Sequence, residues 1–205
     1  MNALLKRLGL SHQVQAFFHA DELSFDYGGT REIYDEGFHY VPTTAHVWQA
    51  GDRYAREVII TSSAMEAVAW FALKKNAYQA GSGLALVSLG NLPSPEQLDW
   101  VRRTFPRRRI TLVFGNHLLG ALTDIRVAGW LQGKNLRLRW QKEKVEISLG
   151  PRQTWLEEAH CSLHQVEKAF GLRSGIRTCK PRVHATYLAQ LQHDASASRA
   201  SPAAP

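Results

Sequence analysis

Hydrophobic and polar positions follow two different periods in the middle of this chain of 205 residues. Three apolar runs, residues 57–61, 84–89 and 109–114, alternate with segments of helical periodicity such as residues 67–73. Short apolar runs separated by amphipathic helices are typical of βαβ units, whose parallel strands are buried on both faces. The pattern therefore predicts an α/β fold with a central, mostly parallel sheet flanked by helices.

The first 55 residues have a different pattern. Residues 1–18 carry apolar side chains at helical spacing and predict one amphipathic helix, although Gly9 weakens its middle. The pair Gly28-Gly29 lies between two alternating runs and predicts a β-hairpin. We interpret the aromatic residues of this region as buried packing, with stacking on single-stranded bases as the alternative. They are Tyr27, Tyr34, Phe38, Tyr40 and Trp48.

Beyond the third apolar run, periodicity predicts a helix over residues 118–131 and two strands over residues 136–140 and 145–149. A further helix is predicted from about Thr154, with Thr154 and Glu157 as its capping box, to Phe170, and Gly171 ends it. The small, proline-containing tail predicts disorder. The expected organisation is a β-rich lead-in (1–55), an α/β core (56–150), a C-terminal helical extension (151–194) and a disordered tail (195–205).

Polar residues follow the first and third of the apolar runs. Glu66 lies at the mouth of the helix after the first run, and the third opens into Gly115-Asn116-His117-Leu118-Leu119-Gly120. This order resembles the Toprim domain of primases and topoisomerases, and it looks closest to Toprim-like proteins found beside mobilisation genes in Bacteroidetes-type bacteria. The resemblance covers roughly residues 55 to 150. It implies that Glu66 is the family's glutamate and that residues 115–120 stand in its Asp-Asn-Asp-x-x-Gly motif.

Both aspartates of that motif are replaced here, by Gly115 and His117. Toprim enzymes hold Mg²⁺ with carboxylates, because this hard cation prefers oxygen ligands, whereas imidazole suits softer metals. The resemblance therefore implies a vestigial catalytic site at Glu66, Asn116 and His117, with no resident metal and no cofactor. The alternative is a Mg²⁺-dependent nuclease or nucleotidyl or phosphoryl transferase, rebuilt around these residues.

The strand ends are also where open α/β sheets bind ligands, so a retained phosphate or nucleotide site is expected near Ser62, Ser63 and Asn91. A purely structural role is equally open, in which Glu66 caps its own helix and His117 packs against Trp70. The decisive observation is whether another carboxylate, such as Asp99 or Asp124, lies within ligand distance of Glu66.

The chain carries a net charge of +7, and its basic residues cluster. Clustered Lys and Arg side chains favour contact with phosphate backbones, with a solvated basic surface as the alternative. The residues predicted to bind nucleic acid are Arg102, Arg103, Arg107, Arg108, Arg109, Lys134, Arg137 and Arg139.

Cysteine and histidine spacing gives little support for a metal centre. Cys161 and Cys179 are the two cysteines, and no Cys-x-x-Cys pair of a zinc ribbon occurs. His160 and His164 are four residues apart on the helix predicted from Thr154 and could share a metal with Cys161 and Glu157, but a polar helix face is the preferred interpretation. No apolar run is long enough to span a bilayer and no secretory leader is recognisable, so we expect no membrane contact and a cytoplasmic protein.

These observations together predict a non-catalytic, Toprim-like protein associated with nucleic acid in a mobile-element mobilisation or replication system. DNA or RNA is the expected partner, and a relaxase, primase or helicase is the expected kind of protein partner. A protein-interaction module without nucleic-acid contact is the remaining class.

Overall fold

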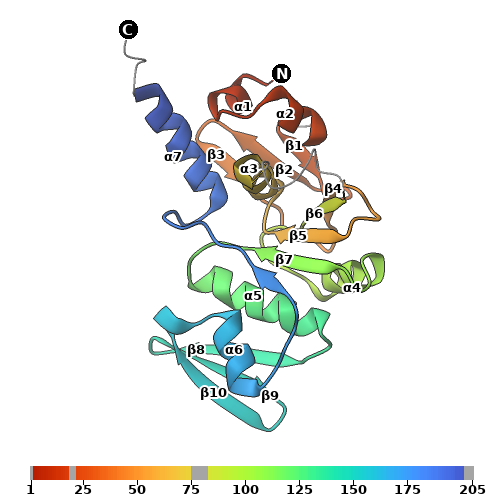
Figure 1. The fold of residues 1–205 in the computed structure, drawn as a ribbon, viewed down its shortest axis with the longest axis vertical. Coiled ribbons are helices and arrows are strands. Elements are labelled where there is room, and N and C mark those ends of the chain that lie inside the picture. The colour runs from red at the N-terminus through yellow and green to blue at the C-terminus, as the bar shows by residue number, and fades with distance from the viewer. Residues whose placement is uncertain (1, 19–21, 75–82, 201–205) are drawn as a thin grey trace.

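A five-stranded sheet runs through the middle of the molecule in the computed structural model, which describes residues 2–18, 22–74 and 83–200 (Figure 1). Its strand order is β11-β7-β5-β6-β4, and only β4 runs antiparallel to its neighbour. The α/β class and the mostly parallel sheet are therefore confirmed. The strands are β4 (Trp48–Gly51), β5 (Glu57–Thr61), β6 (Leu84–Ser88), β7 (Arg109–Val113) and β11 (Arg177–Thr178).

Alternate side chains of the central strands point into two separate cores. Val58 and Ile60 of β5 pack with α4 (Pro95–Thr104) and α5 (Leu118–Leu131), whereas Ile59 packs with α3 (Ala64–Lys74) on the opposite face. This alternation is the pleat of a strand with both faces covered, and it explains why β5 and β6 are almost entirely apolar. Among the described residues, no helix is both long and apolar enough to cross a bilayer.

The N-terminal region packs on the α3 face of the sheet (Figure 1). The predicted hairpin is confirmed, and Gly28 and Gly29 take positive φ between its strands. The single helix predicted over residues 1–18 is wrong, because Gly9 adopts φ +75° and separates two short helices. The elements are α1 (Ala3–Arg7), α2 (His12–Phe18), β1 (Ser24–Asp26), β2 (Arg31–Asp35) and β3 (Phe38–Tyr40).

The aromatic residues of this region divide into two groups. Tyr27, Tyr34 and Trp48 are buried, as the packing interpretation predicts, whereas Phe38 and Tyr40 are exposed on β3. Trp48 also begins β4, which pairs with β6. Residues 48–51 therefore complete the central sheet, although the sequence placed them in the lead-in.

A second antiparallel sheet, of order β10-β9-β8, lies at the other end of the molecule (Figure 1). The helix predicted from Thr154 is wrong over its first turns, because residues 152–157 pair with β9 along their whole length. Helix α6 (Leu163–Phe170) starts later, at the N-cap Ser162, and ends as predicted at Gly171, which adopts the left-handed conformation. The strands are β8 (Leu136–Gln141), β9 (Lys144–Leu149) and β10 (Arg152–Glu157), and the 3-10 turn η3 (Glu158–His160) leads to α6.

The chain ends in a helix, α7 (Tyr187–Ala200), which packs along α3. Disorder predicted from Ala195 is therefore wrong as far as Ala200, and residues 201–205 lie outside the described residues. The physical reason is tertiary: Tyr187, Leu188 and Leu191 are buried in the core that α3 forms, which fixes the first turns of a weakly patterned helix.

Candidate functional site

The carboxyl ends of the central strands meet at the N-terminus of α3, where the fold places Glu66. The first backbone N–H groups of this helix are all engaged by the protein itself. Ala64 N and Met65 N donate to the Glu32 carboxylate at 2.6 and 2.9 Å, and Glu66 N donates to Ser63 Oγ at 2.9 Å. A helix N-terminus at this place is a ready anion site. Here the anion is Glu32, a side chain of β2 from the N-terminal sheet.

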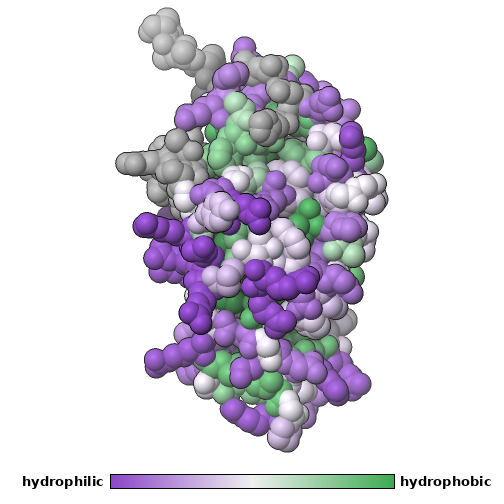
Figure 2. All heavy atoms as spheres, turned by 90° about the vertical axis from the view of Figure 1, so that its right-hand side faces the viewer, coloured by the Kyte–Doolittle hydropathy of each residue, from purple (hydrophilic) through white to green (hydrophobic). Residues whose placement is uncertain are grey.

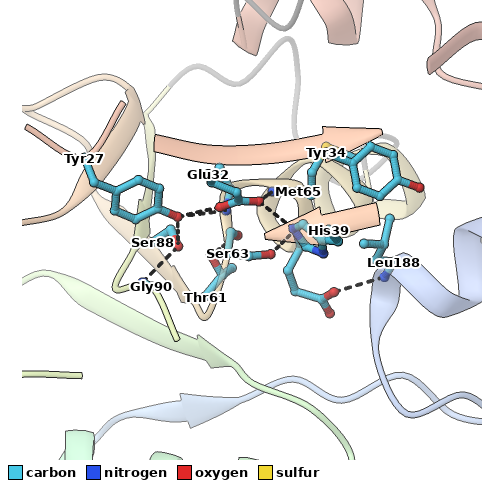
Figure 3. A network of polar contacts seen from close by, with 12 residues as sticks. Tyr27, Glu32, Tyr34, His39, Thr61, Ser63, Met65, Ser88, Gly90 and Leu188 are labelled. Atoms are coloured by element: carbon cyan, nitrogen blue, oxygen red, sulfur yellow. Dashed lines mark hydrogen bonds and ion pairs between the residues drawn. The ribbon is translucent and has the colours of Figure 1, made fainter. Parts of the chain in front are cut away.

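Glu32 is the centre of a buried polar network that joins β2, β3, β6 and α3 (Figure 3). Tyr27 donates its hydroxyl to Glu32 Oε2, and Ser88 Oγ at the end of β6 lies at the same 2.7 Å from that hydroxyl. His39 Nε2 on β3 lies 2.9 Å from Glu32 Oε1. Burial, followed by the charge of Glu32, raises the pKa of Tyr27 well above its usual range. The network ties the N-terminal sheet to the strand ends.

Glu66 uses both of its oxygens on the C-terminal helix. Oε1 accepts a hydrogen bond from Tyr187 N at 2.6 Å, and Oε2 accepts one from Leu188 N at 3.0 Å. The side chain therefore caps α7, and the expectation that Glu66 caps its own helix is wrong. Glu66 is only 4% exposed. Burial raises the pKa of this carboxyl, and the two backbone N–H groups partly offset that rise.

The strap, residues 179–186 between β11 and α7, crosses the end of β7. Cys179 N donates to Leu112 O at 2.8 Å, which continues the β11–β7 pairing. Asn116 is held at both of its nitrogens, since its backbone N donates to Ala185 O at 2.6 Å and its Nδ2 donates to Pro181 O at 3.3 Å. Asn116 and Glu66 therefore both contact the C-terminal segment, which lies over the strand ends.

His117 serves as the N-cap of α5, with Nδ1 accepting a hydrogen bond from Gly120 N at 3.2 Å. The structural role considered from the sequence was packing against Trp70, and the role that its hydrogen bond gives His117 is capping of α5. Gly120 is required by close approach, because a Cβ at this position would overlap the carbonyl oxygen of Gly115. A Cβ at Gly115 would in turn overlap the His117 ring. Close contacts thus explain the glycines at both positions.

Lys180 of the strap supplies the positive charge at the end of β7. Its ammonium group donates to Asp124 Oδ2 at 2.6 Å and to the carbonyl oxygens of Phe114 and Gly115, each at 3.0 Å. Burial raises the pKa of Asp124 to about 6, against the opposing effect of Lys180. Asp99, the other carboxylate considered, lies 3.1 Å from Arg102 and accepts a hydrogen bond from Trp130.

The donor set does not converge on a metal site. Across residues 2–18, 22–74 and 83–200, no three His, Cys, Asp or Glu side chains are placed to hold one ion. Mg²⁺ would require further carboxylate oxygens beside Glu66. Asp124 is bound to Lys180, Asp99 is bound to Arg102 and Trp130, and both oxygens of Glu66 are bound to α7. The histidine pair is also separated, because His160 lies in η3 and His164 in α6. The helix face on which their shared site depended is not formed.

Five of the predicted basic residues surround the opposite, amino edge of the central sheet. Arg102 and Arg103 lie in the last turn of α4, Arg107 and Arg108 in the loop after it, and Arg109 begins β7. Figure 2 views the molecule from the side on which α4 lies and shows hydrophilic side chains across the middle of that face. Parallel strands separate the two edges by roughly 13 Å, at about 3.3 Å per residue.

The arginines of this edge are largely directed to solvent. Arg107 and Arg108 are exposed, and Arg109 lies 3.9 Å from Glu57 with most of its side chain accessible. Sequence reasoning missed Arg56, whose carbonyl accepts a hydrogen bond from Arg109 N and which is also exposed. The parallel pairing of β5 with β7 brings Arg56 to this edge, so recognising the two strands as neighbours would have found it.

The remaining predicted basic residues belong to a different surface. Lys134 lies in the turn after α5, and Arg137 and Arg139 lie on β8 of the second antiparallel sheet. The structure therefore divides the predicted nucleic-acid residues between an edge of one sheet and a face of another.

Glu32 and Lys180 make several of the polar contacts at the strand ends, but they were not among the site residues predicted from the sequence. Glu32 shares the inward face of β2 with Tyr34, and a charged residue at an inward position of an alternating strand signals a buried partner. Lys180 has no comparable signal, because its partners come from residues 114–124 and only the path of the strap brings them together.

Comparison with known proteins gives no match: no family model fits this chain, and no curated protein or solved structure is detectably similar to it. The fold and the contacts of the site are thus the basis for any functional assignment.

Proposed function

We propose that this chain is a non-catalytic, Toprim-like nucleic-acid-binding protein of a mobile-element mobilisation or replication system. One observation carries the proposal: the protein's own groups occupy the carboxyl edge of the central sheet, while exposed arginines surround its amino edge. Both oxygens of Glu66 accept backbone N–H groups of α7, and the α3 N-terminus is bound to Glu32.

Phosphoryl transfer at the carboxyl edge would need oxygen ligands that are free to bind Mg²⁺. Glu66 would have to release α7 first, and Asp124 is held by Lys180. Asn116 is engaged at its backbone and side-chain nitrogens by the strap. The geometry therefore supports a scaffold role for these residues over a catalytic one.

Binding at the amino edge follows from charge. Arg107, Arg108 and Arg56 are exposed around the start of β7, and the chain as a whole is strongly basic. Exposed guanidinium groups bind phosphates through paired N–H donors and release counterions from the nucleic acid. DNA or RNA is the proposed partner. A relaxase, primase or helicase is the proposed kind of protein partner, and the cytoplasm is the proposed compartment.

The test compares two triple variants that lose the same charge. Arg107→Ala, Arg108→Ala and Arg109→Ala together should weaken binding to all sequences similarly, because phosphate contacts carry no sequence information. On duplex DNA, the slope of log K against log salt should fall by roughly 0.9 for each lost contact. The control combines Lys6→Ala, Arg7→Ala and Arg31→Ala, three exposed positions of the N-terminal region. Fluorescence anisotropy titrations at several salt concentrations give both slopes.

Three results would overturn the proposal. Equal losses in the two triple variants would mean that net charge alone attracts the nucleic acid, and no binding of DNA or RNA by the wild type at low salt would favour a protein-interaction module. Mg²⁺-dependent cleavage that Glu66→Gln abolishes would establish the rebuilt enzyme instead.

A further inference from the structure

The β8–β9–β10 sheet has one covered face and one open face. Val145 and Ile147 of β9 point inward and are buried with side chains of α5 and α6. Both helices lie on one side of this sheet, and the other side faces away from the rest of the molecule (Figure 1). The strand register gives the residues of the open face, because side chains alternate along each strand. They are Arg137, Arg139, Gln141, Lys144, Glu146, Ser148, Gln153, Trp155 and Glu157.

Exposed tryptophan is the unusual feature of this sheet. Trp155 lies on the open face with 46% of its surface accessible, and Trp140, at the end of β8, is 58% accessible. The other four tryptophans of the chain are buried or partly buried. By register Trp140 pairs with the inward Val145, so Trp155 is the tryptophan of the open face. A large aromatic side chain there adds nothing to the core, and tryptophan is a residue type that is enriched at interfaces.

The charge along the neighbouring edge of the sheet is positive. Strand β8 and the turns on either side of it span residues 134–143. This segment carries four basic residues, Lys134, Arg137, Arg139 and Lys142, and one acidic residue, Glu143. On the open face itself, Lys144 pairs with Glu157 at 3.0 Å. Beyond that pair the face holds two arginines and the partly buried Glu146. The open face thus has a small positive excess, and Lys134 and Lys142 at the β8 edge extend it, which favours an anionic partner.

The register sets how the aromatic and the basic groups are arranged. Trp155 and Arg139 both pair with Glu146, from opposite sides of β9, so they lie in one row across the sheet. At a strand spacing of about 4.8 Å, their backbones are roughly 10 Å apart. A base stacked on the indole of Trp155 therefore lies two strands away from the guanidinium groups of β8, with Glu146 of β9 between them.

We propose that this open face binds single-stranded nucleic acid, with a base stacked on Trp155 and phosphates bound by Arg137 and Arg139. That the partner is a nucleic acid rests on the proposed function. The new claims are that the nucleic acid is single-stranded and that it binds to this face. The single strand follows from the chemistry of stacking, since bases in a duplex already cover each other's faces and cannot stack on an aromatic side chain. The amino-edge arginines, by contrast, contact only phosphates and accept either form.

The experiment measures binding of a fluorescein-labelled oligothymidylate and of a duplex of the same length by anisotropy. Trp155→Ala should weaken binding of the single strand about tenfold or more and leave duplex binding unchanged, because stacking on one aromatic side chain is worth about that factor. Trp155→Phe should restore most of the loss. Arg137→Ala with Arg139→Ala should weaken binding and lower its salt dependence. The control is Arg182→Ala with Val183→Ala, an exposed arginine and an exposed apolar side chain of the strap.

The outcomes separate this inference from the proposed function. Single-strand binding that is unchanged in Trp155→Ala, while the amino-edge triple variant loses duplex binding, would overturn the inference alone. Equal losses for the single strand and the duplex in Trp155→Ala would also overturn it, since stacking would then not be the interaction. A wild type that binds neither form at low salt would overturn both. Circular dichroism of each variant checks that the fold is retained, which the exposure of these side chains predicts.

Discussion

The two edges of the central sheet differ in what their polar groups contact. At the carboxyl edge, Glu66 and Asn116 are bound to α7 and the strap. At the amino edge, Arg107 and Arg108 are exposed. Open α/β sheets usually present ligand sites at the carboxyl edge. In this protein the same edge holds the fold together, which shows that a polar residue at the expected place indicates a site only when its partners are known.

The carboxyl edge is built as a series of helix caps. Glu32 from the N-terminal sheet caps α3, and Glu66 from the first turn of α3 caps α7. Each carboxylate satisfies N–H groups that a helix leaves without partners at its N-terminus, and each is favoured there by the helix dipole. The three parts of the chain are thereby joined through two buried side chains. If the carboxyl edge stabilises the fold and the amino edge does not, substitutions at the two edges should differ in their effect on the free energy of unfolding.

The largest effect is expected for Glu32→Ala. The substitution leaves Met65 N without its buried acceptor, Ala64 N with only the Tyr27 hydroxyl at 3.1 Å, and that hydroxyl with only Ser88 Oγ as acceptor. Loss of one partner in a buried charged network costs about 3–5 kcal/mol, so the free energy of unfolding should fall by this order. Urea denaturation followed by circular dichroism measures it. A loss below about 1 kcal/mol would mean that water replaces the carboxylate and that the network does not hold the edge.

A smaller and more local effect is expected for Glu66→Ala. The two N–H groups at the start of α7 lose their acceptor, at a cost of about 2–4 kcal/mol for hydrogen bonds to a charged group. Because α7 packs at the end of the chain, this loss should appear mainly as opening of α7. Hydrogen exchange should accelerate in residues 187–192 far more than in β5 or β6. Uniform acceleration in all elements would show that α7 does not open separately.

Asp124→Asn should remove a pH dependence from stability. The pKa of Asp124 is raised in the folded protein to about 6, from its ordinary 3.8. The carboxyl therefore contributes stability that is fully present below about pH 4 and is lost as the pH rises through 6. At about 1.36 kcal/mol for each pKa unit, the difference in unfolding free energy between wild type and variant should grow by on the order of 2 kcal/mol from pH 7 to pH 4. A constant difference would show that Lys180 keeps Asp124 ionised throughout.

The smallest effect on stability is expected at the amino edge. Replacing Arg107, Arg108 and Arg109 by Ala should change the free energy of unfolding by less than about 1 kcal/mol, because exposed charges and their ion pairs contribute little. Thermal unfolding of the triple variant beside Glu66→Ala checks this. A loss as large as that of Glu66→Ala would remove the contrast between the edges and would weaken the assignment of these arginines to binding.

The spacing of hydrophobic residues correctly predicted those strands whose burial pattern stays the same from one end to the other. The apolar runs of β5 and β6, and β7 from Thr111 on, are buried on both faces. The alternating run of β9 is buried on one face, and Leu136 and Leu138 of β8 are partly buried on that face, so each period reports its own burial. The hairpin at Gly28-Gly29 was equally readable, since its turn needs positive φ that glycine supplies without strain. The predicted helix starts also placed Glu66 and His117 at helix N-termini, where the structure has them.

The tertiary structure alone decided what these residues do. The strand β10 replaced a helix start that Thr154 and Glu157 suggested, because pairing along β9 outweighs a capping motif. Helix α7 forms from a tail that composition marks as disordered, because the α3 face and the Glu66 carboxylate stabilise it. Glu66 and Leu188 are 122 residues apart, and no local pattern encodes a contact over that distance. Sequence thus determined which side chains are polar and where they stand on their elements, and the packing of distant segments determined which partners satisfy them.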